Sequence, residues 1–441
     1  MPATLPLALD ALPTTGALVV AFSGGLDSTA LLHALATHPV ARDRGLRAVH
    51  VHHGLQAGAD AWAAHCARQA SAMDVALRII EVQVSRRAGL GLEGAARQAR
   101  YQALASALQP GEVLVTAHHQ DDQAETFLLR ALRASGPEGL GAMRPLRRFA
   151  PGWHWRPLLA TPRPHLLDHA RAHGLDWIED PSNAIADAER NFLRLQVLPL
   201  LQQRWPHAAA ALARSAQLSA QADALLQAED TQLLRTHAGE GGHTLPVDLL
   251  LALPAERSAR LLRRWVRSLG LPPLPARGVA QVTRSLLHAR PDAEARFAWA
   301  GARVLRWRGL LHADLERTPL PADWSARWEG REMLALPGGG QLLLRDAAGR
   351  PSPAGFDAPV QVRARHGGER IHLAGRQHSH ALKHLLQERG VPPWRRAQLP
   401  LLCAASGQVL AAGDVALAST FGHWLHAHGL SLCWHAPGDP R

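Results

Sequence analysis

The sequence predicts an α/β fold in its first half, a parallel and doubly wound sheet, followed by a helical region and a small α+β region. Four short apolar runs alternate with helical patterns between residues 17 and 133. Such alternation predicts a parallel sheet with helices on both faces. The sequence then becomes rich in Ala, Leu, Gln and Arg from about Trp205, and short strand-like runs return from about Val360.

The first-half elements follow from local patterns. The run ALVVAF at residues 17–22 is apolar throughout and ends at a glycine turn, which is typical of a buried strand. The other strands are expected at 46–51, 76–82 and 113–117, and the helices at 28–36, 59–73, 92–108 and 121–133. The Gly-, Pro- and Arg-rich stretch 136–164 is expected to be loop, with helices following at 166–173 and 191–203.

The second half is expected to hold helices from about residue 205 to 287, followed by a looser segment and a linker at 319–323 (PLPAD). The last part is expected to carry one helix at 379–389 among short strands. A chain of 441 residues is long enough for two to four domains. We predict three domains, with boundaries at residues 1–215, 216–320 and 321–441.

Composition narrows the class of protein. The 48 basic residues exceed the 37 acidic ones and give a net charge of +11, which is typical of proteins that bind a polyanion such as nucleic acid. Lys383 is the only lysine, and this choice of arginine fits a GC-rich genome. No apolar run reaches the ~20 residues of a membrane span, and residues 1–16 lack the basic start of a signal peptide. We therefore expect a cytoplasmic protein.

The three cysteines, Cys66, Cys403 and Cys433, are far apart and form no C-x-x-C motif. This pattern disfavours a disulfide framework, a zinc ribbon and an iron–sulfur site.

The strongest local signal is the hexapeptide SGGLDS between the first strand and the first helix, formed by Ser23, Gly24, Gly25, Leu26, Asp27 and Ser28. Two glycines allow a tight turn and a close approach to a ligand, and the N–H groups that begin a helix attract an anion. Neither the P-loop nor the Rossmann motif is present. The turn predicts phosphate binding, with Asp27 near a magnesium ion or, alternatively, only capping the helix.

A second polar segment, HHQDDQAET at residues 118–126, follows the fourth strand. The spacings Asp121/Glu125 and Asp122/Glu125 put these carboxylates on one helix face. They predict a pocket for a cation, either Mg²⁺ or an ammonium group, although acids at a helix start are also favoured by the helix dipole alone.

Arginines and histidines accompany these acids. Arg97 and Arg100 share a helix face with Glu93, and Arg190 and Arg194 form a second pair, each either a phosphate ligand or an ion-paired surface. Five histidines lie at the predicted strand ends: His50, His52, His53, His118 and His119. We expect them to contact nucleotide or substrate in preference to binding zinc.

Together these segments resemble the tRNA(Ile)-lysidine synthetase family, a branch of the N-type ATP pyrophosphatases (PP-loop superfamily), over nearly the whole chain. The matching stretches are 23–28 (SGGLDS), 50–55 (HVHHGL), 93–101 (EGAARQARY), 116–129 (TAHHQDDQAETFLL), 156–159 (RPLL), 179–183 (EDPSN), 190–194 (RNFLR), 367–369 (GGE), 382–388 (LKHLLQE) and 391–396 (VPPWRR). The stretch GLGAM at 139–143 departs from the family pattern, because Ala142 replaces a glycine.

The resemblance implies an adenine nucleotide alpha hydrolase-like fold and a ligase that adenylates the wobble cytidine of a tRNA-Ile with a CAU anticodon. Free lysine then displaces AMP to form lysidine. It implies ATP and Mg²⁺, with Asp27 at the metal and Asp122 and Glu125 binding lysine.

The same resemblance makes Arg97 and Arg190 candidates for stabilising phosphate charge, and Lys383, Arg395 and Arg396 candidates for contacting tRNA. It assigns tRNA binding to the second and third predicted domains. A homodimer is compatible with it. The alternatives are another PP-loop enzyme of tRNA, such as a thiolase, a glutamine-dependent synthetase, or a non-catalytic tRNA-binding module.

Overall fold

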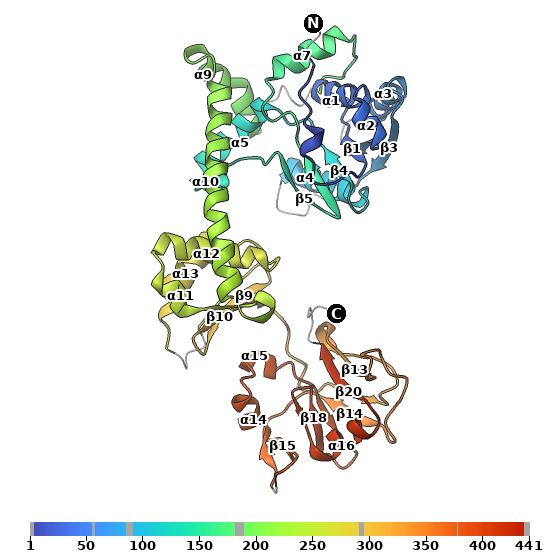
Figure 1. Cartoon of the computed structure of the whole chain (residues 1–441), viewed down its shortest axis with the longest axis vertical. Coiled ribbons are helices and arrows are strands. Elements are labelled where there is room, and N and C mark those ends of the chain that lie inside the picture. Colours follow the sequence, from blue (N-terminus) through green and yellow to red (C-terminus); the bar gives the residue numbers. More distant parts are fainter. Residues whose placement is uncertain are drawn as a thin grey trace. The chain divides into compact units, whose positions relative to one another are not determined.

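The structure is a computed structural model that describes residues 4–54, 58–84, 91–180, 189–290, 295–376 and 378–435. The chain divides into two compact units, Met1–Glu229 and Asp230–Arg441. Figure 1 shows the first unit as a sheet with helices around it, and the long helix α10 (Ala208–His237) contains the boundary between the units.

The sheet of the first unit has six strands in the order β3-β2-β1-β4-β6-β5. The four strands expected from the sequence all form, each within two residues of its predicted ends, and they are parallel to their neighbours. Their bounds are β1 Leu18–Ala21, β2 Leu46–His52, β3 Ala76–Glu81 and β4 Val113–Val115.

Helices cover both faces of this sheet, as predicted. Leu18 and Val20 of β1 belong to a buried core with residues of α1, α3 and α7, whereas Val19 belongs to the core on the opposite face with Leu104 of α4. This alternation follows from the two-residue period of a strand. The helices are α1 Leu26–Ala36, α2 Pro39–Asp43, α3 Ala59–Ala72, α4 Gly91–Ser106, α5 Gln120–Leu132 and α7 Arg163–Ala172.

The expectation of a loop at 136–164 is wrong. This stretch holds a short helix, α6 (Pro137–Leu140), and a hairpin of β5 (Leu146–Phe149) and β6 (Gly152–Trp155). β6 lies parallel to β4, and β5 pairs antiparallel to β6 at the edge of the sheet. Arg147 and Arg148 made the segment look like loop, but an edge strand tolerates charged side chains, and Arg148 stacks 4.0 Å from the Trp153 ring.

The helix expected at 191–203 forms as three joined pieces. They are α8 (Glu189–Phe192), a π-helical segment (Leu193–Val197) and α9 (Leu198–Arg204). The wider π turn contains Arg194, and such turns are frequent at functional sites.

The second unit begins with helices, as expected, namely α11 (Val247–Ala252), α12 (Ala255–Ser268) and α13 (Ala276–Arg284). The segment expected to be loose instead supplies three strands of an antiparallel sheet in the order β7-β10-β9-β8. The strands of this sheet are β7 Thr244–Pro246, β8 Arg296–Trp299, β9 Ala302–Trp307 and β10 Leu310–Leu315. The fourth strand, β7, interrupts the stretch 205–287 that was expected to be helical. Arg303 and Arg306 within β9 hid its strand character in the sequence.

The last part has its own core and is α+β, as predicted. One sheet has the order β11-β14-β17-β18-β19, a second β12-β13-β20, and β15 pairs with β16. The strands are β11 Ser325–Trp328, β12 Leu334–Ala335, β13 Gln341–Arg345, β14 Val360–Arg363, β15 Arg370–Ile371, β16 His380–Ala381, β17 Leu401–Cys403, β18 Val409–Ala412, β19 Ala416–Leu417 and β20 Ser431–His435; the helices are α14 Leu382–Glu388, α15 Pro393–Arg396 and α16 Ser419–Ala427.

Within the part of the chain that the structure describes, no helix has the length and apolar character needed to cross a membrane. The division into three domains at 215 and 320 stays a prediction.

Candidate active site

The turn at residues 23–28 joins β1 to α1 at the carboxyl end of the central strand, where parallel sheets bind their ligands. Gly24 has φ +78°, and a Cβ there would lie 2.7 Å from the Cys66 sulfur, so the turn requires glycine. Gly25 is the N-cap of α1 and has no side chain to cap it. The first N–H groups of the helix therefore have no intrahelical acceptor and are suited to an anion.

The two serines of the turn have different surroundings. The hydroxyl of Ser28 is buried, donates to the Gly25 carbonyl at 3.0 Å and accepts from the Ser23 N–H at 3.2 Å. Ser28 therefore holds the shape of the turn. Ser23 is exposed, with its hydroxyl 3.0 Å from that of Ser28, and is the more accessible of the two. The Ile178 N–H donates to the Gly24 carbonyl at 2.9 Å.

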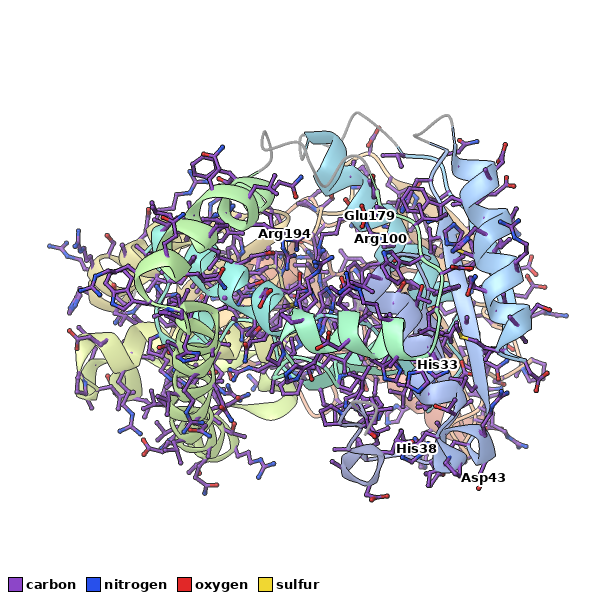
Figure 2. All side chains as sticks on the ribbon, turned by 90° about the horizontal axis from the view of Figure 1, so that it is seen from above. His33, His38, Asp43, Arg100, Glu179 and Arg194 are labelled. Atoms are coloured by element: carbon purple, nitrogen blue, oxygen red, sulfur yellow. The ribbon has the colours of Figure 1, made fainter. Side chains whose placement is uncertain are left out.

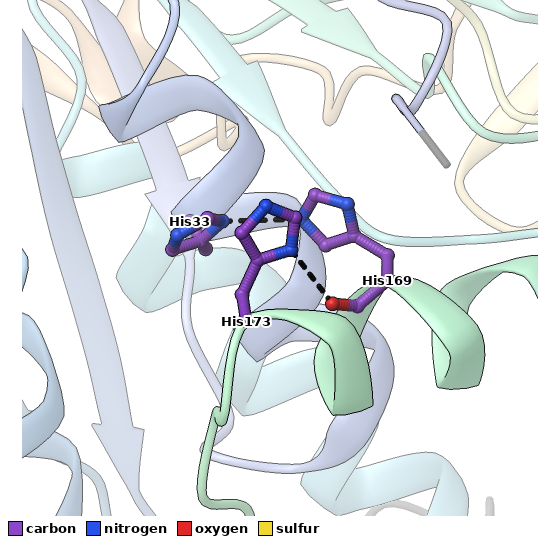
Figure 3. Close-up of side chains that lie close together, drawn as sticks. All are labelled: His33, His169 and His173. Atoms are coloured by element: carbon purple, nitrogen blue, oxygen red, sulfur yellow. Dashed lines mark hydrogen bonds between the residues drawn. The ribbon is translucent and has the colours of Figure 1, made fainter. Parts of the chain in front are cut away.

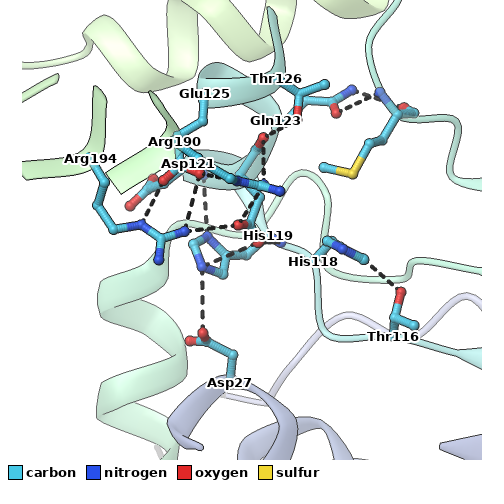
Figure 4. A network of polar contacts seen from close by, with 12 residues as sticks. Asp27, Thr116, His118, His119, Asp121, Gln123, Glu125, Thr126, Arg190 and Arg194 are labelled. Atoms are coloured by element: carbon cyan, nitrogen blue, oxygen red, sulfur yellow. Dashed lines mark hydrogen bonds and ion pairs between the residues drawn. The ribbon is translucent and has the colours of Figure 1, made fainter. Parts of the chain in front are cut away.

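Asp27, in the first turn of α1, points toward the start of α5 (Figure 4). Its Oδ2 lies 3.6 Å from Nε2 of His119, and its Oδ1 lies 3.7 Å from Nε of Arg163 at the start of α7. Oδ1 is buried, and no described residue forms a hydrogen bond to it. Asp27 thus brings a carboxylate oxygen into the space between three helix starts.

His119 is the N-cap of α5 and connects Asp27 to the acidic helix. Its Nδ1 accepts from the Asp121 N–H at 3.3 Å, so the proton of the neutral ring lies on Nε2, 3.5 Å from Asp122 Oδ2. The His119 N–H in turn donates to Asp122 Oδ2 at 3.0 Å. Burial lowers the pKa of His119, but its contact with Asp27 and the charge of Asp122 outweigh burial and raise it above the ordinary value.

Two carboxylates of α5 are bound by two arginines (Figure 4). Arg190 donates from Nε to Glu125 at 2.6 Å and from Nη2 to Asp122 at 2.9 Å. Arg194 donates from Nε to Glu125 at 2.7 Å and from Nη2 to Asp122 at 3.1 Å. The Glu125 side chain is fully buried. Because each arginine bridges both acids, the removal of one carboxylate leaves both guanidinium groups with a single carboxylate partner.

The neighbouring acids Asp121 and Asp122 have opposite pKa shifts. Burial raises the pKa of Asp122, but the charges of His119 and Arg190 outweigh it and hold the pKa at about 2. Burial and the nearby Asp122 charge raise the pKa of Asp121. No described residue forms a hydrogen bond or ion pair with the Asp121 carboxylate. When the pKa values of adjacent carboxyl groups diverge in this way, the group with the lowered pKa, here Asp122, stays an anion, and the group with the raised pKa, here Asp121, can accept a proton.

A buried polar chain lies at the ends of β4 and β6. The Thr116 hydroxyl is 2.7 Å from His118 Nδ1 and 2.9 Å from His154 Nε2. Arg156 lies 3.1 Å from the other nitrogen of His154 and is buried. Burial lowers the pKa of His118 to about 3 and that of His154 to about 2, so these rings are neutral. Arg97, of α4, is exposed and stacks 5.1 Å from the Tyr101 ring.

The other candidate histidines contact nearby residues. His50 is buried, with Nδ1 2.9 Å from the Phe22 carbonyl, and His52 lies 3.0 Å from Asp60. Burial lowers the pKa of His53 to about 4. In the described residues the three histidines that come together as potential metal ligands are others: His33, His169 and His173.

The structure therefore brings Asp27, Asp122, Glu125 and Arg190 together around His119. The EDPSN stretch is described only as far as Asp180, and its Glu179 can be located in Figure 2. Residues 181–183, Leu55 and the side chains of residues 91–93 lie outside the described part of the chain. Lys383, Arg395 and Arg396 belong to the second unit. Sequence reasoning missed Arg163, because an arginine at a helix start carries no signal for a contact 136 residues away.

The departure at GLGAM has a structural consequence. Ala142 has φ +47°, a left-handed conformation that favours glycine. The loop is nevertheless fixed to α5, because Gln123 exchanges two 3.0 Å hydrogen bonds with the Met143 backbone and Arg130 donates to the Ala142 carbonyl at 3.0 Å.

Matches to known proteins cover nearly the whole chain. Protein-family models match at residues 7–201 (a PP-loop domain), 245–312 (a TilS substrate binding domain) and 360–434 (a TilS substrate C-terminal domain). The tRNA(Ile)-lysidine synthase of Xanthomonas axonopodis pv. citri (strain 306) is 54% identical over 430 residues, which cover 97% of this chain and 96% of that protein. The protein of that name from Escherichia coli O157:H7 is 43% identical over 406 residues, 91% of this chain and 92% of its own.

Proposed function

The chain belongs to the tRNA(Ile)-lysidine synthase family, and from this premise we propose how its residues join free L-lysine to the wobble cytidine of a tRNA-Ile with a CAU anticodon. The oxygen on carbon 2 of the base attacks the α-phosphorus of ATP, and pyrophosphate leaves. The lysine ε-nitrogen then bonds to carbon 2, and AMP leaves with the oxygen. A base carbonyl is a poor electrophile, and the AMP group makes its oxygen a good leaving group.

The observation that carries this proposal is the glycine turn between β1 and α1, where Gly25 leaves the first N–H groups of the helix without a capping side chain. The PP-loop domain implies ATP as the nucleotide. We assign its phosphates to the N–H groups of residues 24–28, because the Ser23 N–H donates to Ser28, with the exposed Ser23 hydroxyl as an added donor. Arg97 is exposed and is our candidate for stabilising negative charge during adenylation, because a guanidinium fork can bind two phosphate oxygens at once.

The residues present fit a magnesium ion beside this turn. Asp27 Oδ1 is buried without a described hydrogen-bond partner, and a carboxylate oxygen is a ligand that Mg²⁺ prefers. A bound Mg²⁺ would neutralise phosphate charge there. Arg163, 3.7 Å from the same oxygen, would then orient Asp27 from the other side, while His119 holds its second oxygen.

The lysine step needs an anion that binds an ammonium and a base that removes its proton. At a pKa of ~10.4 the amine costs about 5 kcal/mol to deprotonate at pH 7. We propose that Asp122 and Glu125 together form the lysine site. Asp122 binds the ammonium directly in place of one guanidinium, and the fully buried Glu125 contributes its negative charge from within the cluster. Arg190, once released from Asp122, would have Nη2 available for phosphate. Glu125 would keep Arg194.

We assign the base to Asp121. Burial and the Asp122 charge raise its pKa against the opposing charges of His119 and Arg163, and no described side chain forms a hydrogen bond or ion pair with its carboxylate. It lies next to Asp122 in the sequence, within the first turn of α5. A carboxylate with a raised pKa accepts a proton more readily than one held near 2, as Asp122 is.

We propose that tRNA contacts outside the anticodon are electrostatic and come from residues 216–320 and 321–441. Lys383 is exposed on α14, and Arg395 is exposed on α15. Arg396 is half-buried and donates from Nε to the Val391 carbonyl at 2.6 Å, so only part of its guanidinium can face RNA. Lys383→Ala should weaken tRNA binding. It should also make the slope of log binding constant against log salt concentration shallower by about the amount that one phosphate contact contributes. An unchanged slope contradicts this contact.

A thiolase function is not favoured. Cys66 is fully buried, and burial raises the pKa of its thiol to about 12; burial also raises the pKa of Cys403. Neither is poised to act as a thiolate. The cytoplasmic location and a homodimer stay predictions.

Mass analysis of the anticodon nucleosides tests the proposed reaction. After incubation with ATP and lysine, the wobble cytidine of tRNA-Ile should gain the mass of lysine less water, and a methionine tRNA with the same CAU anticodon should not. Unmodified cytidine in both tRNAs, with an active preparation of a relative as positive control, contradicts the proposal.

A further inference from the structure

The C-terminal ends of α1 and α7 bring together three histidines that the reaction does not use (Figure 3). His33 lies on the last turn of α1, His169 lies in α7, and His173 follows α7 directly. Nδ1 of His33 is 3.1 Å from Nε2 of His169. One ring nitrogen of each of the three residues lies within 4.8 Å of the other two.

We propose that His33, His169 and His173 form a transition-metal site that ties α7 to α1. Nitrogen ligands at the zinc–nitrogen distance of ~2.0–2.1 Å in a tetrahedral site lie roughly 3.3 Å apart. The His33–His169 pair is already at this spacing. His173 is exposed, so a small adjustment of its ring toward the pair would not disturb the core.

The tautomer of His173 supports metal binding. Its Nδ1 lies 2.9 Å from the His169 carbonyl, and a carbonyl only accepts, so Nδ1 carries the proton. The Nε2 lone pair of His173 is therefore available for a ligand. A ring fixed by one nitrogen on a backbone carbonyl while the other faces the metal is a recurring arrangement in metal sites.

The ligand set indicates which metals fit. Three imidazole nitrogens suit Zn²⁺, Cu²⁺, Ni²⁺ or Co²⁺ and do not suit Mg²⁺, which prefers oxygen. The exposed side of the cluster leaves a fourth position for water.

The site is separate from the proposed magnesium site. His33 follows Asp27 by six residues on the same helix, which is roughly 9 Å along the axis. Both ends of α7 nonetheless contact α1, because Arg163 at its start lies 3.7 Å from Asp27 and His169 at its end contacts His33. A metal at the far end would hold the helix that carries Arg163, so its role is structural and positioning.

The experiment uses the full chain without an affinity tag, stripped with a chelator and titrated with Zn²⁺ against a chromophoric competitor. The variants are His33→Gln and His173→Gln. His207→Gln, which changes an exposed histidine of the same unit, is the matched control. Circular dichroism establishes that each variant is folded, and substitution with Co²⁺ reports tetrahedral nitrogen ligation by its visible absorption.

Wild type and His207→Gln should each bind one equivalent of Zn²⁺ more tightly than both cluster variants. Zinc affinity should fall by at least ~10–100-fold in the cluster variants, because removal of a residue that only hydrogen-bonds to a metal ligand already costs this much. Zn²⁺ should also raise Tm in wild type and the control only. Equal zinc affinity in wild type and both folded cluster variants, or no tetrahedral Co²⁺ spectrum in wild type, overturns the proposal and leaves a hydrogen-bonded histidine cluster.

Discussion

Asp122→Asn tests whether the charged cluster on α5 is held together as the structure indicates. The substitution keeps the size of the side chain and removes its charge beside Arg190, Arg194 and His119. The Asp122 pKa falls from an ordinary value of 3.8 to about 2 in the folded chain. At 1.36 kcal/mol per pKa unit, this shift corresponds to about 2 kcal/mol of stability at pH 7.

The sign of the pH dependence follows from the depressed pKa. The stabilisation is complete above the unfolded pKa of 3.8, falls to about half at pH 3, and is lost as the pH passes through about 2. The difference in stability between wild type and Asp122→Asn should therefore shrink between pH 5 and pH 2. A difference independent of pH would show that lost packing, and not lost charge, is responsible.

Pulse proteolysis at increasing urea concentration can measure this difference, with mass-spectrometric detection of fragments from the first unit, since the two units need not unfold together. Asp43→Asn is the control, because Asp43 is exposed (Figure 2) and a surface substitution usually changes stability by less than about 0.5 kcal/mol. Equal effects of the two substitutions at pH 7 would refute the reasoning. In activity assays Asp122→Asn should abolish lysine incorporation and spare much of the ATP binding.

Three further predictions concern single residues. Asp27→Ala should eliminate transfer of AMP to tRNA in the absence of lysine, as measured with α-labelled ATP; retained transfer would remove Asp27 from the metal site. The wild-type lysine step should accelerate as the pH rises through the raised pKa of Asp121, because the base acts only when deprotonated, and Asp121→Asn should abolish that acceleration in single-turnover assays begun from adenylated tRNA; an unchanged pH profile excludes Asp121 as the base. Ala142→Gly should relieve about 1 kcal/mol of left-handed strain, partly offset by greater unfolded-chain entropy, and raise Tm by at most ~2–4 °C, whereas Ala142→Val should lower it; a lower Tm for the glycine variant contradicts the strain.

The sequence alone was sufficient for the central sheet and the parts of the site carried by its strand ends. The alternation of apolar runs and helical patterns predicted the four strands β1, β2, β3 and β4. The strand–turn–helix context of residues 23–28 predicted that Asp27 lies at the carboxyl end of β1. The i,i+3 spacing of Asp122 and Glu125 put both on one face of α5. These features depend on local periodicity, which a single sequence displays directly.

The features that were missed depend on tertiary contacts or on a mixed composition. The β5–β6 hairpin and β9 contain arginines that look like loop in a chain whose basic residues are nearly all arginine. The bonds of Arg190 and Arg194 to the α5 carboxylates join residues about 65 positions apart, and the His33–His169 contact joins residues 136 apart. Spacing along the chain carries no information about such pairs, so the sequence could suggest arginine for phosphate without revealing its bonds to Asp122 and Glu125.

The central claim is that the glycine turn after β1 holds ATP so that AMP passes to the RNA base. The most direct measurement is transfer of label from α-labelled ATP to tRNA-Ile with lysine omitted, followed by a chase with unlabelled ATP and lysine. We predict that label enters the tRNA and is released as AMP when lysine is added, and that Gly24→Ala, which would bring a Cβ 2.7 Å from the Cys66 sulfur, prevents the transfer. Label that never reaches tRNA in the wild type, or that transfers equally in a folded Gly24→Ala variant, would contradict the account.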